Sequence, residues 1–507
     1  MLESIVAAIP GLFDPTLILM IFAGVAIGMT GGALPGISPS ITVALLLPIA
    51  FTLDPLSSLV ALGAIYMAAE YGGSISAILI NTPGTAAAVC TGMDGHPMAR
   101  EGKAQDALNL AVISSSIGGL FGVIVLILFT PPIAKFSLEF KSPEMFWLAL
   151  AGLAIVCNLT ASNFVKGVIS ALIGMFIATI GYELETGYAR FAFGVPEIEA
   201  GISLVPCIIG FFAIPQMLLL ASNKDDTVTE IVPTPGSFGR MIRYVISKPI
   251  LTLRSAVIGT FIGILPGAGA SIASFVSYSE AKRFSKEPES FGTGNPDGIV
   301  ASECANNSMV GGSLIPLLAL GIPGSASAAV LFGAITLHGL VPGGRMFSES
   351  GDIVYGFMVG FIPVVIAMLI VGVAFAPLFA RVLRVPTSMI VPSVLLLALI
   401  GTYSFQGSMI DILITATTGI LGFFLLKFGF SLPSVVLGII LAPMAEEGYR
   451  RSIRLGEIEG SIWHVFFGSP ICIILAIVVV VMVFSAFYNE HRSRKRQALR
   501  DQSPSET

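Results

Sequence analysis

Charged residues are scarce in this chain. Asp, Glu, Lys and Arg make up 11% of its 507 residues, whereas a soluble domain carries about 25%. Hydrophobic residues make up 55%, and the mean hydropathy is +0.91. This composition excludes an ordinary soluble domain and predicts an all-α polytopic membrane protein. The net charge of -5 is small for this length and does not indicate a nucleic-acid partner.

Motifs for metal binding and catalysis are missing. The five cysteines show no Cys-x2-Cys spacing and do not cluster with the four histidines, so neither a disulfide framework nor a zinc site is indicated. No phosphate-binding Gly-x4-Gly-Lys-Ser/Thr loop, His-Glu-x2-His or Gly-x-Ser-x-Gly motif occurs. We therefore expect no enzyme activity and no cofactor. Energy for concentrating a solute would come from an ion gradient or another subunit.

Basic residues are absent before Arg100. The segment ahead of the first apolar run holds Glu3 and Asp14 but no Lys or Arg, so a cleavable signal peptide is not expected. At the other end, residues 463–488 form an apolar run that exceeds the roughly 20 residues needed to cross a bilayer. A basic cluster follows it, formed by His491, Arg492, Arg494, Lys495 and Arg496. Since basic residues stay cytoplasmic, we expect a cytoplasmic C-terminus.

The apolar runs predict about 11–12 transmembrane segments, several of them short enough to be half-helices or re-entrant hairpins. We divide the chain into a first transmembrane repeat at 1–222, a connecting loop at 223–249, a second repeat at 250–489 and a disordered cytoplasmic tail at 490–507. The connecting loop is the least apolar stretch and contains Lys224, Asp225, Asp226 and Glu230. A second polar loop is expected at 280–303.

Two apolar runs share an unusual pattern. Gly28-x3-Gly32-x2-Pro35-Gly36 lies in the first half, and Gly259-x3-Gly263-x2-Pro266-Gly267 lies in the second. Proline removes a backbone donor and clashes with the preceding turn, while glycine weakens a helix, so both helices should break at the Pro-Gly step. We call Pro35-Gly36 the first break and Pro266-Gly267 the second break.

A second shared motif follows each break. Gly72-Gly73-Ser74 precedes Asn81-Thr82-Pro83-Gly84-Thr85, which we call the first tip loop, and Gly311-Gly312-Ser313 precedes Gly321-Ile322-Pro323-Gly324-Ser325, the second tip loop. Nine residues separate Ser74 from Pro83, and ten separate Ser313 from Pro323. Two ordered motifs at nearly equal spacing predict an internal duplication.

The charges around the two breaks differ. The first lies between Asp14 and Asp54, whereas the second lies between Arg254 and the basic cluster at 282–286. Opposite flanking charge favours two repeats of inverted topology, as in many secondary transporters. Lys135 and Lys141 in the first half and Arg381 and Arg384 in the second fall at similar repeat positions. A parallel repeat therefore remains the alternative.

A broken membrane helix frees backbone groups for binding. The N–H groups at a half-helix N-terminus suit an anion such as a carboxylate, and the carbonyls at the other broken end suit a cation such as Na+. The hydroxyls near each break, Ser274 and Ser327 among them, could instead serve only interhelical hydrogen bonds. The candidate substrate-binding residues are Pro35, Gly36, Ser38, Ser40, Asn81, Thr82, Pro83, Gly84, Thr85, Pro266, Gly267, Gly269, Ser271, Pro323, Gly324 and Ser325.

Few acidic side chains lie within the apolar segments. Glu70, Asn81 and Glu303 are candidates for ion coupling, because an intramembrane carboxylate is costly unless it faces a cavity or a partner. For Glu70 the alternative is a loop-end carboxylate that reaches the interface. Interfacial positions are also the simpler interpretation of Glu303 and of Asp94 and His96. We expect Asp411 at a segment end and His338 to be structural.

The same residues resemble a known family. GMTGGALPGISPSITVALLLPIAF, EYGGSISAILINTPGTAAAVCTGMDGHPMAREGKA, GTFIGILPGAGASIASFVSYSEAKR and GSLIPLLALGIPGSASAAVLFGAITLHGLVPG closely resemble the large membrane subunit of the tripartite tricarboxylate transporters, the TctA family. The resemblance runs from about residue 15 to residue 470. It implies a bacterial inner-membrane permease that works with a small membrane subunit (TctB-like) and a periplasmic solute-binding protein (TctC-like).

The resemblance also implies uptake of citrate or a related carboxylate with Na+ or H+, at two re-entrant hairpins with polar tips. Carried onto this chain, those tips are the two tip loops. The second has Gly321-Ile322 where the first has Asn81-Thr82, so two identical ion sites are not expected. A passive organic-anion channel and a non-catalytic assembly scaffold are the alternatives to an ion-driven permease.

Overall fold

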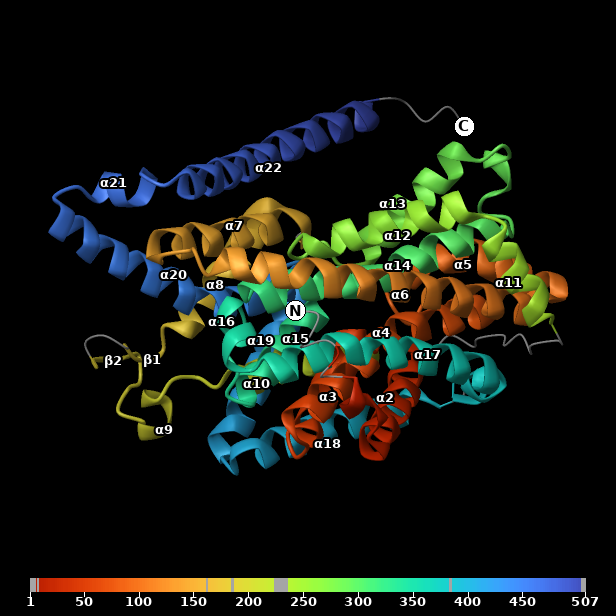
Figure 1. Cartoon of the computed structure of the whole chain (residues 1–507), viewed down its shortest axis with the longest axis horizontal. Coiled ribbons are helices and arrows are strands. Elements are labelled where there is room, and N and C mark those ends of the chain that lie inside the picture. The colour runs from red at the N-terminus through yellow and green to blue at the C-terminus, as the bar shows by residue number, and fades with distance from the viewer. Residues whose placement is uncertain are drawn as a thin grey trace. The chain divides into compact units, whose positions relative to one another are not determined.

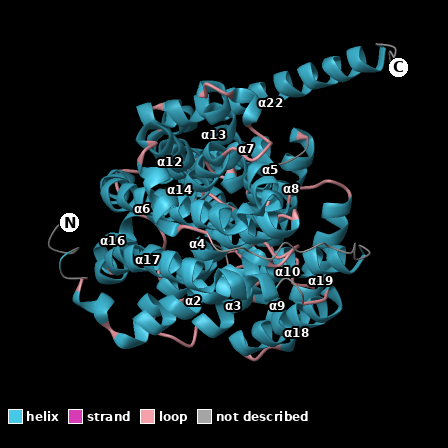
Figure 2. Cartoon of the chain, turned by 90° about the vertical axis from the view of Figure 1, so that its right-hand side faces the viewer, coloured by secondary structure: helices cyan, strands magenta, loops and turns pink. Residues whose placement is uncertain are grey.

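The structure is a computed structural model that describes residues 6, 9–160, 163–183, 187–222, 236–382 and 385–502. Helices dominate the described residues (Figure 2), as the composition predicted. The charged residues of the expected connecting loop at 224–230, and Arg384, lie outside the described residues.

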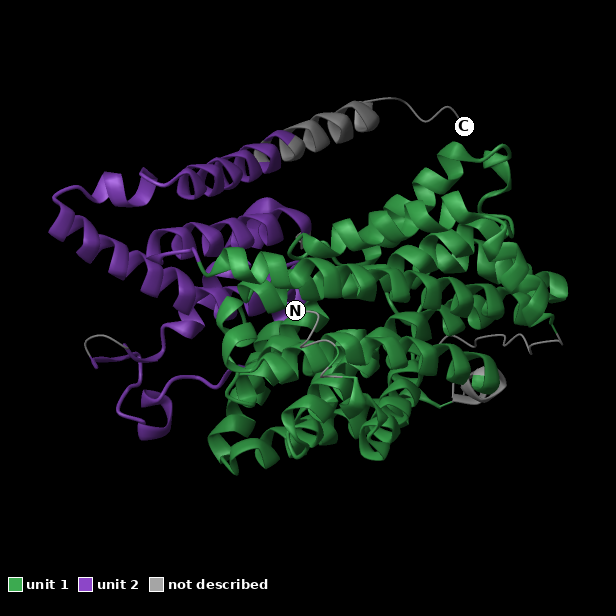
Figure 3. Cartoon of the chain, viewed as in Figure 1, with its two compact units in different colours: residues 1–138, 205–423 green, residues 139–204, 424–507 purple. Residues whose placement is uncertain are grey.

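The chain splits into two compact units, and neither coincides with a sequence half (Figure 3). One unit combines residues 1–138 with 205–423, and the other combines residues 139–204 with 424–507. Each unit therefore takes segments from both predicted repeats. The division into repeats at 1–222 and 250–489 stays a prediction.

The first unit contains both breaks and both tip loops. Its helices from the first half are η1 (Pro10–Phe13), α2 (Pro15–Ala33), α3 (Pro39–Ala50), α4 (Pro55–Ile80), α5 (Ala88–Met98), the π-helical turn η2 (Ala99–Lys103) and α6 (Ala104–Ser137). Its later helices are α10 (Leu204–Ser222), α11 (Phe238–Ile246), α12 (Pro249–Ile264), α13 (Gly269–Phe284), η3 (Pro288–Ser290), α14 (Pro296–Leu320), α15 (Ala326–Leu337), α16 (Gly344–Glu349), α17 (Gly351–Val382), α18 (Thr387–Gln406) and most of α19 (Met409–Lys427).

The second unit is smaller. It comprises α7 (Ser142–Thr160), α8 (Phe164–Ala178), the short antiparallel strands β1 (Gly181–Tyr182) and β2 (Ala189–Arg190), α9 (Pro196–Glu199), α20 (Leu432–Glu459), α21 (Ile462–Phe467) and α22 (Pro470–Gln502). Helix α20 packs on α7 and α8, and α22 packs on α7. An ion pair between Arg190 and Glu446 at 2.6 Å joins β2 to α20.

Both helices break where the sequence predicted. Helix α2 ends at Ala33 and α3 begins at Pro39, while α12 ends at Ile264 and α13 begins at Gly269. The break glycines adopt the left-handed conformation, with φ of 84° at Gly36 and 78° at Gly267. L-residues with a side chain are strained in that conformation, which explains the glycines.

Each break contacts the tip loop of its own copy. A Cβ added to Gly84 would overlap the carbonyl oxygen of Gly32, and one added to Gly324 would overlap that of Gly263. The Gly267 N–H donates to the Gly324 carbonyl at 3.0 Å. The two copies are therefore built alike around glycine-to-backbone contacts.

The structure corrects the register of the repeat by one residue. The Gly84 N–H donates to the Gly73 carbonyl, and the Gly324 N–H donates to the Ser313 carbonyl, both at 3.2 Å. Gly73 therefore corresponds to Ser313, and the spacing to the tip proline is ten residues in both copies. Both copies contain the sequence Gly-Gly-Ser, so the sequence comparison aligned Ser74 with Ser313. In the structure, the second Gly-Gly-Ser is shifted by one residue relative to the first.

The tip-bearing helices α4 and α14 lie at the centre of the first unit. Within each copy, α2 packs on α4 and α12 packs on α14. Between copies, α6 of the first half packs on α14 and α17 of the second half packs on α4 (Figure 1). All of α4 that could span a bilayer is buried.

Eight described helices are long and apolar enough to cross a membrane, or nine if the bent pair α11 and α12 forms one span. Those two helices meet at 79°. Four shorter apolar helices of 10–17 residues accompany them, including α3 and α15. The chain is thus a multi-pass membrane protein, and the count of 11–12 segments stays a prediction.

Several expected boundaries differ in the structure. The polar loop at 280–303 is shorter, because α13 continues to Phe284 and α14 begins at Pro296. Residues 238–246 of the connecting loop form α11. The last apolar run divides at Pro470, where a new helix starts because proline suits a first helical turn. Helix α22 continues to Gln502, where a disordered tail was expected from residue 490, since Ala, Leu, Lys and Arg favour helix.

Asn81 and Gly321 play the same backbone role. Each caps its helix in the left-handed conformation, with φ of 54° and 72°. Asn81→Gly should therefore keep the thermal stability of the wild type, whereas Asn81→Val should lower stability by about 1–2 kcal/mol. Thermal unfolding of the purified variants measures this difference. A Val variant as stable as the Gly variant would contradict the shared role.

Candidate functional site

The first tip loop is partly exposed, with Gly84 and Thr85 buried, and it is stabilised by its own hydrogen bonds. Asn81 ends α4, and the Thr82 hydroxyl donates to the Ile80 carbonyl at 3.3 Å. The Thr85 hydroxyl accepts from the Ala88 N–H at 3.3 Å and so helps to start α5. Asn81 is exposed, and Thr82 and Pro83 are half-buried. A ligand can therefore reach this loop.

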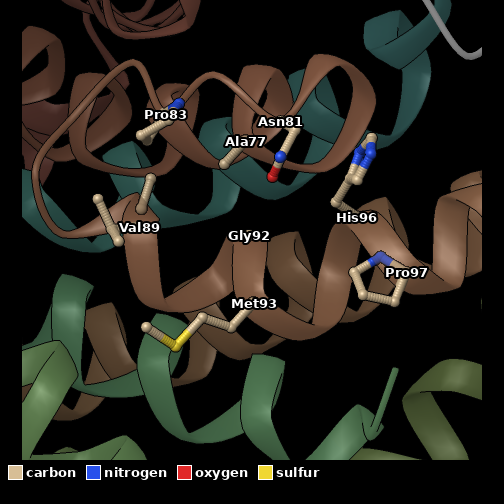
Figure 4. Close-up of a pocket in the computed structure, with 9 residues that line it drawn as sticks. Ala77, Asn81, Pro83, Val89, Gly92, Met93, His96 and Pro97 are labelled. Carbon is tan, nitrogen blue, oxygen red and sulfur yellow. The ribbon is translucent and has the colours of Figure 1, made fainter. Parts of the chain in front are cut away.

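A pocket of about 330 Å³ lies between the first tip loop and α5 (Figure 4). It is lined by Ala77, Asn81, Pro83, Ala88, Val89, Gly92, Met93, His96 and Pro97. Three predicted features meet here: the tip loop, the first turn of α5 and His96. The N-terminal turn of a helix carries unpaired N–H groups and partial positive charge, which favour an anion.

His96 is the titratable side chain that lines the pocket. Its Nδ1 lies 3.0 Å from the Ile78 carbonyl oxygen, which requires a proton on Nδ1 for a hydrogen bond. The ring is thereby held against the end of α4, and Nε2 can accept a hydrogen bond when the ring is neutral or donate one when it is charged. His96 is half-buried and forms part of the pocket wall, and its interfacial position stays a prediction.

The second tip loop is buried. All residues from Gly321 to Ser325 are inaccessible. Ser325 caps α15 through the Ala328 N–H at 3.1 Å, and its hydroxyl lies 2.7 Å from the hydroxyl of Tyr66 on α4. Tyr66 also lies 3.1 Å from the Ser313 hydroxyl. This loop thus packs against the first half and differs in accessibility from its counterpart.

The two copies also differ on the helix that follows the tip. Gly92 lies nine residues after Pro83, and Phe332 lies nine residues after Pro323. Gly92 is buried and lines the pocket, and a Cβ at that position would meet only ordinary contacts, with the Ala77 Cβ 3.5 Å away. The first copy therefore leaves space where the second carries a large side chain.

The serines near the breaks mostly serve local structure. Ser38 caps α3 through the Ile41 N–H and lies 2.9 Å from the Ser40 hydroxyl. In the second half, Gly269 is left-handed with φ of 64°, and Ser271 is half-buried. The Ser274 hydroxyl donates to the Ser302 carbonyl at 3.2 Å. Among the described residues, no hydrogen bond joins the two tip loops, so the candidate residues gather into two separate groups.

Glu303 lies in the middle of α14 and is fully buried. Three hydroxyls donate to its carboxylate: Ser74 of α4, Thr91 of α5, and Ser115 of α6 at 2.6 Å. We call these three residues the hydroxyl cluster. The Thr91 hydroxyl also lies 3.0 Å from that of Ser302. One carboxylate from the second half is thus held by three helices of the first half.

Polar atoms without a hydrogen-bond partner lie on α4 and α14, the helices that carry Glu70 and Glu303. Glu70 is 5% exposed, and no hydrogen bond to its carboxyl from a described residue is found. The buried Tyr71 hydroxyl and the side-chain carbonyls of Asn306 and Asn307 also lack partners. Asn306 donates to the Glu70 backbone carbonyl at 3.1 Å. A polar region therefore runs through the centre of the first unit.

Asp94 links α5 to the second half. Its Oδ1 accepts from the backbone N–H groups of Gly292, Gly294 and Asn295 at 2.8–3.0 Å, and its Oδ2 accepts from the Tyr278 hydroxyl at 2.8 Å. These four donors replace water around a carboxylate that is fully buried. Asp94 is therefore a structural anchor.

The sequence left Glu70 open between ion coupling and an interfacial position, and it favoured an interfacial position for Asp94 and Glu303. All three are buried, two of them because local hydroxyl or N–H donors satisfy the carboxylate. Asp411 does lie in the first turn of α19, and the His338 ring packs 5.6 Å from the Phe51 ring. Among the described residues, no group of three His, Cys, Asp or Glu side chains could hold a metal ion.

Sequence reasoning missed Gly92, Thr91 and Ser115. Thr91 and Ser115 are single hydroxyl residues in apolar helices, and only the packing of α5 and α6 on α14 brings them to Glu303. Gly92 carried one usable signal, which is its replacement by Phe332 in the second copy.

The sequence is similar to a known protein family and to two proteins of Agrobacterium vitis. The sequence model of the tripartite tricarboxylate transporter TctA family matches residues 18–437. A protein of Agrobacterium vitis described as an uncharacterized 52.8 kDa protein in the TAR-I ttuC' 3' region is 34% identical over 487 residues, which cover 95% of each chain. An uncharacterized protein in the TAR-II ttuC' 3' region of the same organism is 33% identical over 239 residues, 47% of this chain and 98% of its own. No solved structure matches. The chain belongs to the TctA family of tripartite tricarboxylate transporters.

Proposed function

We propose that this chain is the large permease subunit of a bacterial inner-membrane transporter that takes up citrate or a related carboxylate with an ion gradient. The substrate would bind in the pocket beneath the first tip loop. The observation that carries this proposal is the accessible pocket at Asn81, Pro83 and His96 in a family of transporters.

The pocket has the chemistry that a carboxylate needs. The first turn of α5 forms one wall through Ala88 and Val89 and supplies partial positive charge. The Asn81 amide can donate a hydrogen bond, and His96 can donate one from Nε2 when protonated. The apolar remainder of the wall, including Met93, excludes water and strengthens these contacts.

The wider assembly follows from the family. A TctC-like periplasmic protein would deliver the substrate, and a TctB-like membrane subunit would complete the transporter. The basic residues after position 490 would hold the C-terminus in the cytoplasm. Na+ or H+ would supply the driving force, and the two copies would be inverted repeats that alternate access to the pocket.

Filling the pocket should stop uptake. Gly92→Phe places in the first copy the residue that the second copy carries, so α5 should still fold while the pocket is occupied. We expect uptake of labelled citrate by cells expressing all three subunits to fall to background, whereas Gly92→Ala, the control, should retain most activity. Uptake by the Phe variant at the wild-type rate, with equal membrane abundance, would contradict the assignment.

The breaks should also be essential. Replacing Gly36 or Gly267 with a bulky residue forces a side chain into the left-handed conformation and disturbs the contact with the tip loop. Both variants should reach the membrane and lose uptake. Wild-type rates in both would refute a role for the breaks.

Active transport can be separated from a passive channel by the same assay. The proposal requires that labelled citrate accumulates inside above its external concentration and that an ionophore abolishes the accumulation. Equilibration without accumulation would instead favour the channel.

A further inference from the structure

We propose that Glu303 binds the proton that drives uptake and that it acts on the substrate pocket through α5. This inference rests on the proposed function and assigns its coupling ion and coupling residue. The argument begins with the hydroxyl cluster of Ser74, Thr91 and Ser115 around the carboxylate.

Glu303 has no basic partner. Among the described residues, no Lys, Arg or His forms an ion pair or hydrogen bond with it, and its exposure is 0%. Taking an unpaired charge out of water is expensive, and three neutral donors offset only part of that cost. Burial without a cation therefore makes the charged form of this carboxyl group costly.

Other titratable groups lie close to the Glu303 carboxylate. Glu70 and Tyr71 of α4, Cys90 of α5 and Cys304 of α14 lie near enough to interact with its charge. Helix α6 contributes the Ser115 hydroxyl. The remaining neighbours are engaged elsewhere: Asp94 and Tyr278 bond to each other, and Arg254 of α12 lies over the Phe284 ring.

Glu70 is a second buried carboxyl group near Glu303. Like charges in a buried site repel each other, so a proton on either carboxyl group removes part of that repulsion. A variant of each residue is therefore needed to assign a proton to one of them.

The geometry points to a proton rather than Na+. The cluster hydroxyls touch the carboxylate directly, so a metal ion would have to be inserted between oxygens already in contact. A proton needs no such space, because it sits on a carboxylate oxygen. One hydroxyl then turns from donor to acceptor, and the released proton leaves the same oxygen when the site empties.

Helix α5 connects this site with the pocket. Thr91 holds Glu303, and its neighbours Val89, Gly92, Met93 and His96 line the pocket. Protonation of Glu303 removes the charge that the Thr91 hydroxyl binds, which loosens α5 from α14. Proton binding and the shape of the substrate pocket are therefore coupled through one helix.

Infrared spectroscopy tests the proton directly. In the purified full-length chain in lipid, a pH titration should show a protonated-carboxyl band that Glu303→Gln weakens, and Glu70→Gln identifies the part of the band that belongs to Glu70. Ser115→Ala removes a donor to the charged form and should move the midpoint of that band about 1–2 pH units upward. Ser116→Ala is the control, because the Ser116 hydroxyl bonds to Val112 of its own helix and should cause no shift.

Three outcomes of these measurements would contradict the proton site. A band of equal strength in the wild type and Glu303→Gln, equal shifts in Ser115→Ala and Ser116→Ala, or a response to Na+ and not to pH would overturn the assignment. None of these readouts depends on transport.

A transport assay separates this inference from the proposed function. In proteoliposomes with all three subunits, Glu303→Gln should lose accumulation of labelled citrate driven by an imposed pH gradient but keep exchange of internal for external citrate. Accumulation by this variant at the wild-type level would refute the proton site and leave the permease intact. Absence of both accumulation and exchange in the wild type would count against citrate uptake, while the infrared result would still decide on Glu303.

Discussion

The close contact between each broken helix and its tip loop is the constraint on which the rest of the first unit depends. Gly84 lies against the Gly32 carbonyl and Gly324 against the Gly263 carbonyl, at distances that exclude any side chain. The glycines before each break, Gly32 and Gly263, are thus buried in protein, whereas Gly36 is exposed and Gly267 is half-buried. The same contacts fix where α5 and α15 begin.

The two copies share a backbone arrangement but differ in the exposure of their tip loops and in their polar side chains. The first tip loop is partly exposed and borders a pocket, whereas the second is buried against Tyr66 of α4. Glu303 of the second half reaches into three helices of the first. The architecture therefore supports one substrate pocket on one copy, with the other copy supplying a buried carboxylate behind it.

The sequence predicted the features that local chemistry determines. Proline and glycine located both breaks, and the repeated motif located both tips. The difference between Asn81 and Gly321 argued against two identical ion sites, yet both residues serve a left-handed helix end. Burial was harder to predict, because Ser74, Thr91 and Ser115 satisfy Glu303 only after α4, α5 and α6 pack around α14. The pocket likewise depends on the packing of α5 beneath the tip loop. A local sequence pattern does not predict this packing.

The most direct test of this asymmetry is an experimental structure of the assembled transporter with and without a bound carboxylate. The account predicts ligand density between Asn81 and His96, beneath the first tip loop, and none at the second. Density at the second tip loop, or shared equally between the two, would contradict it.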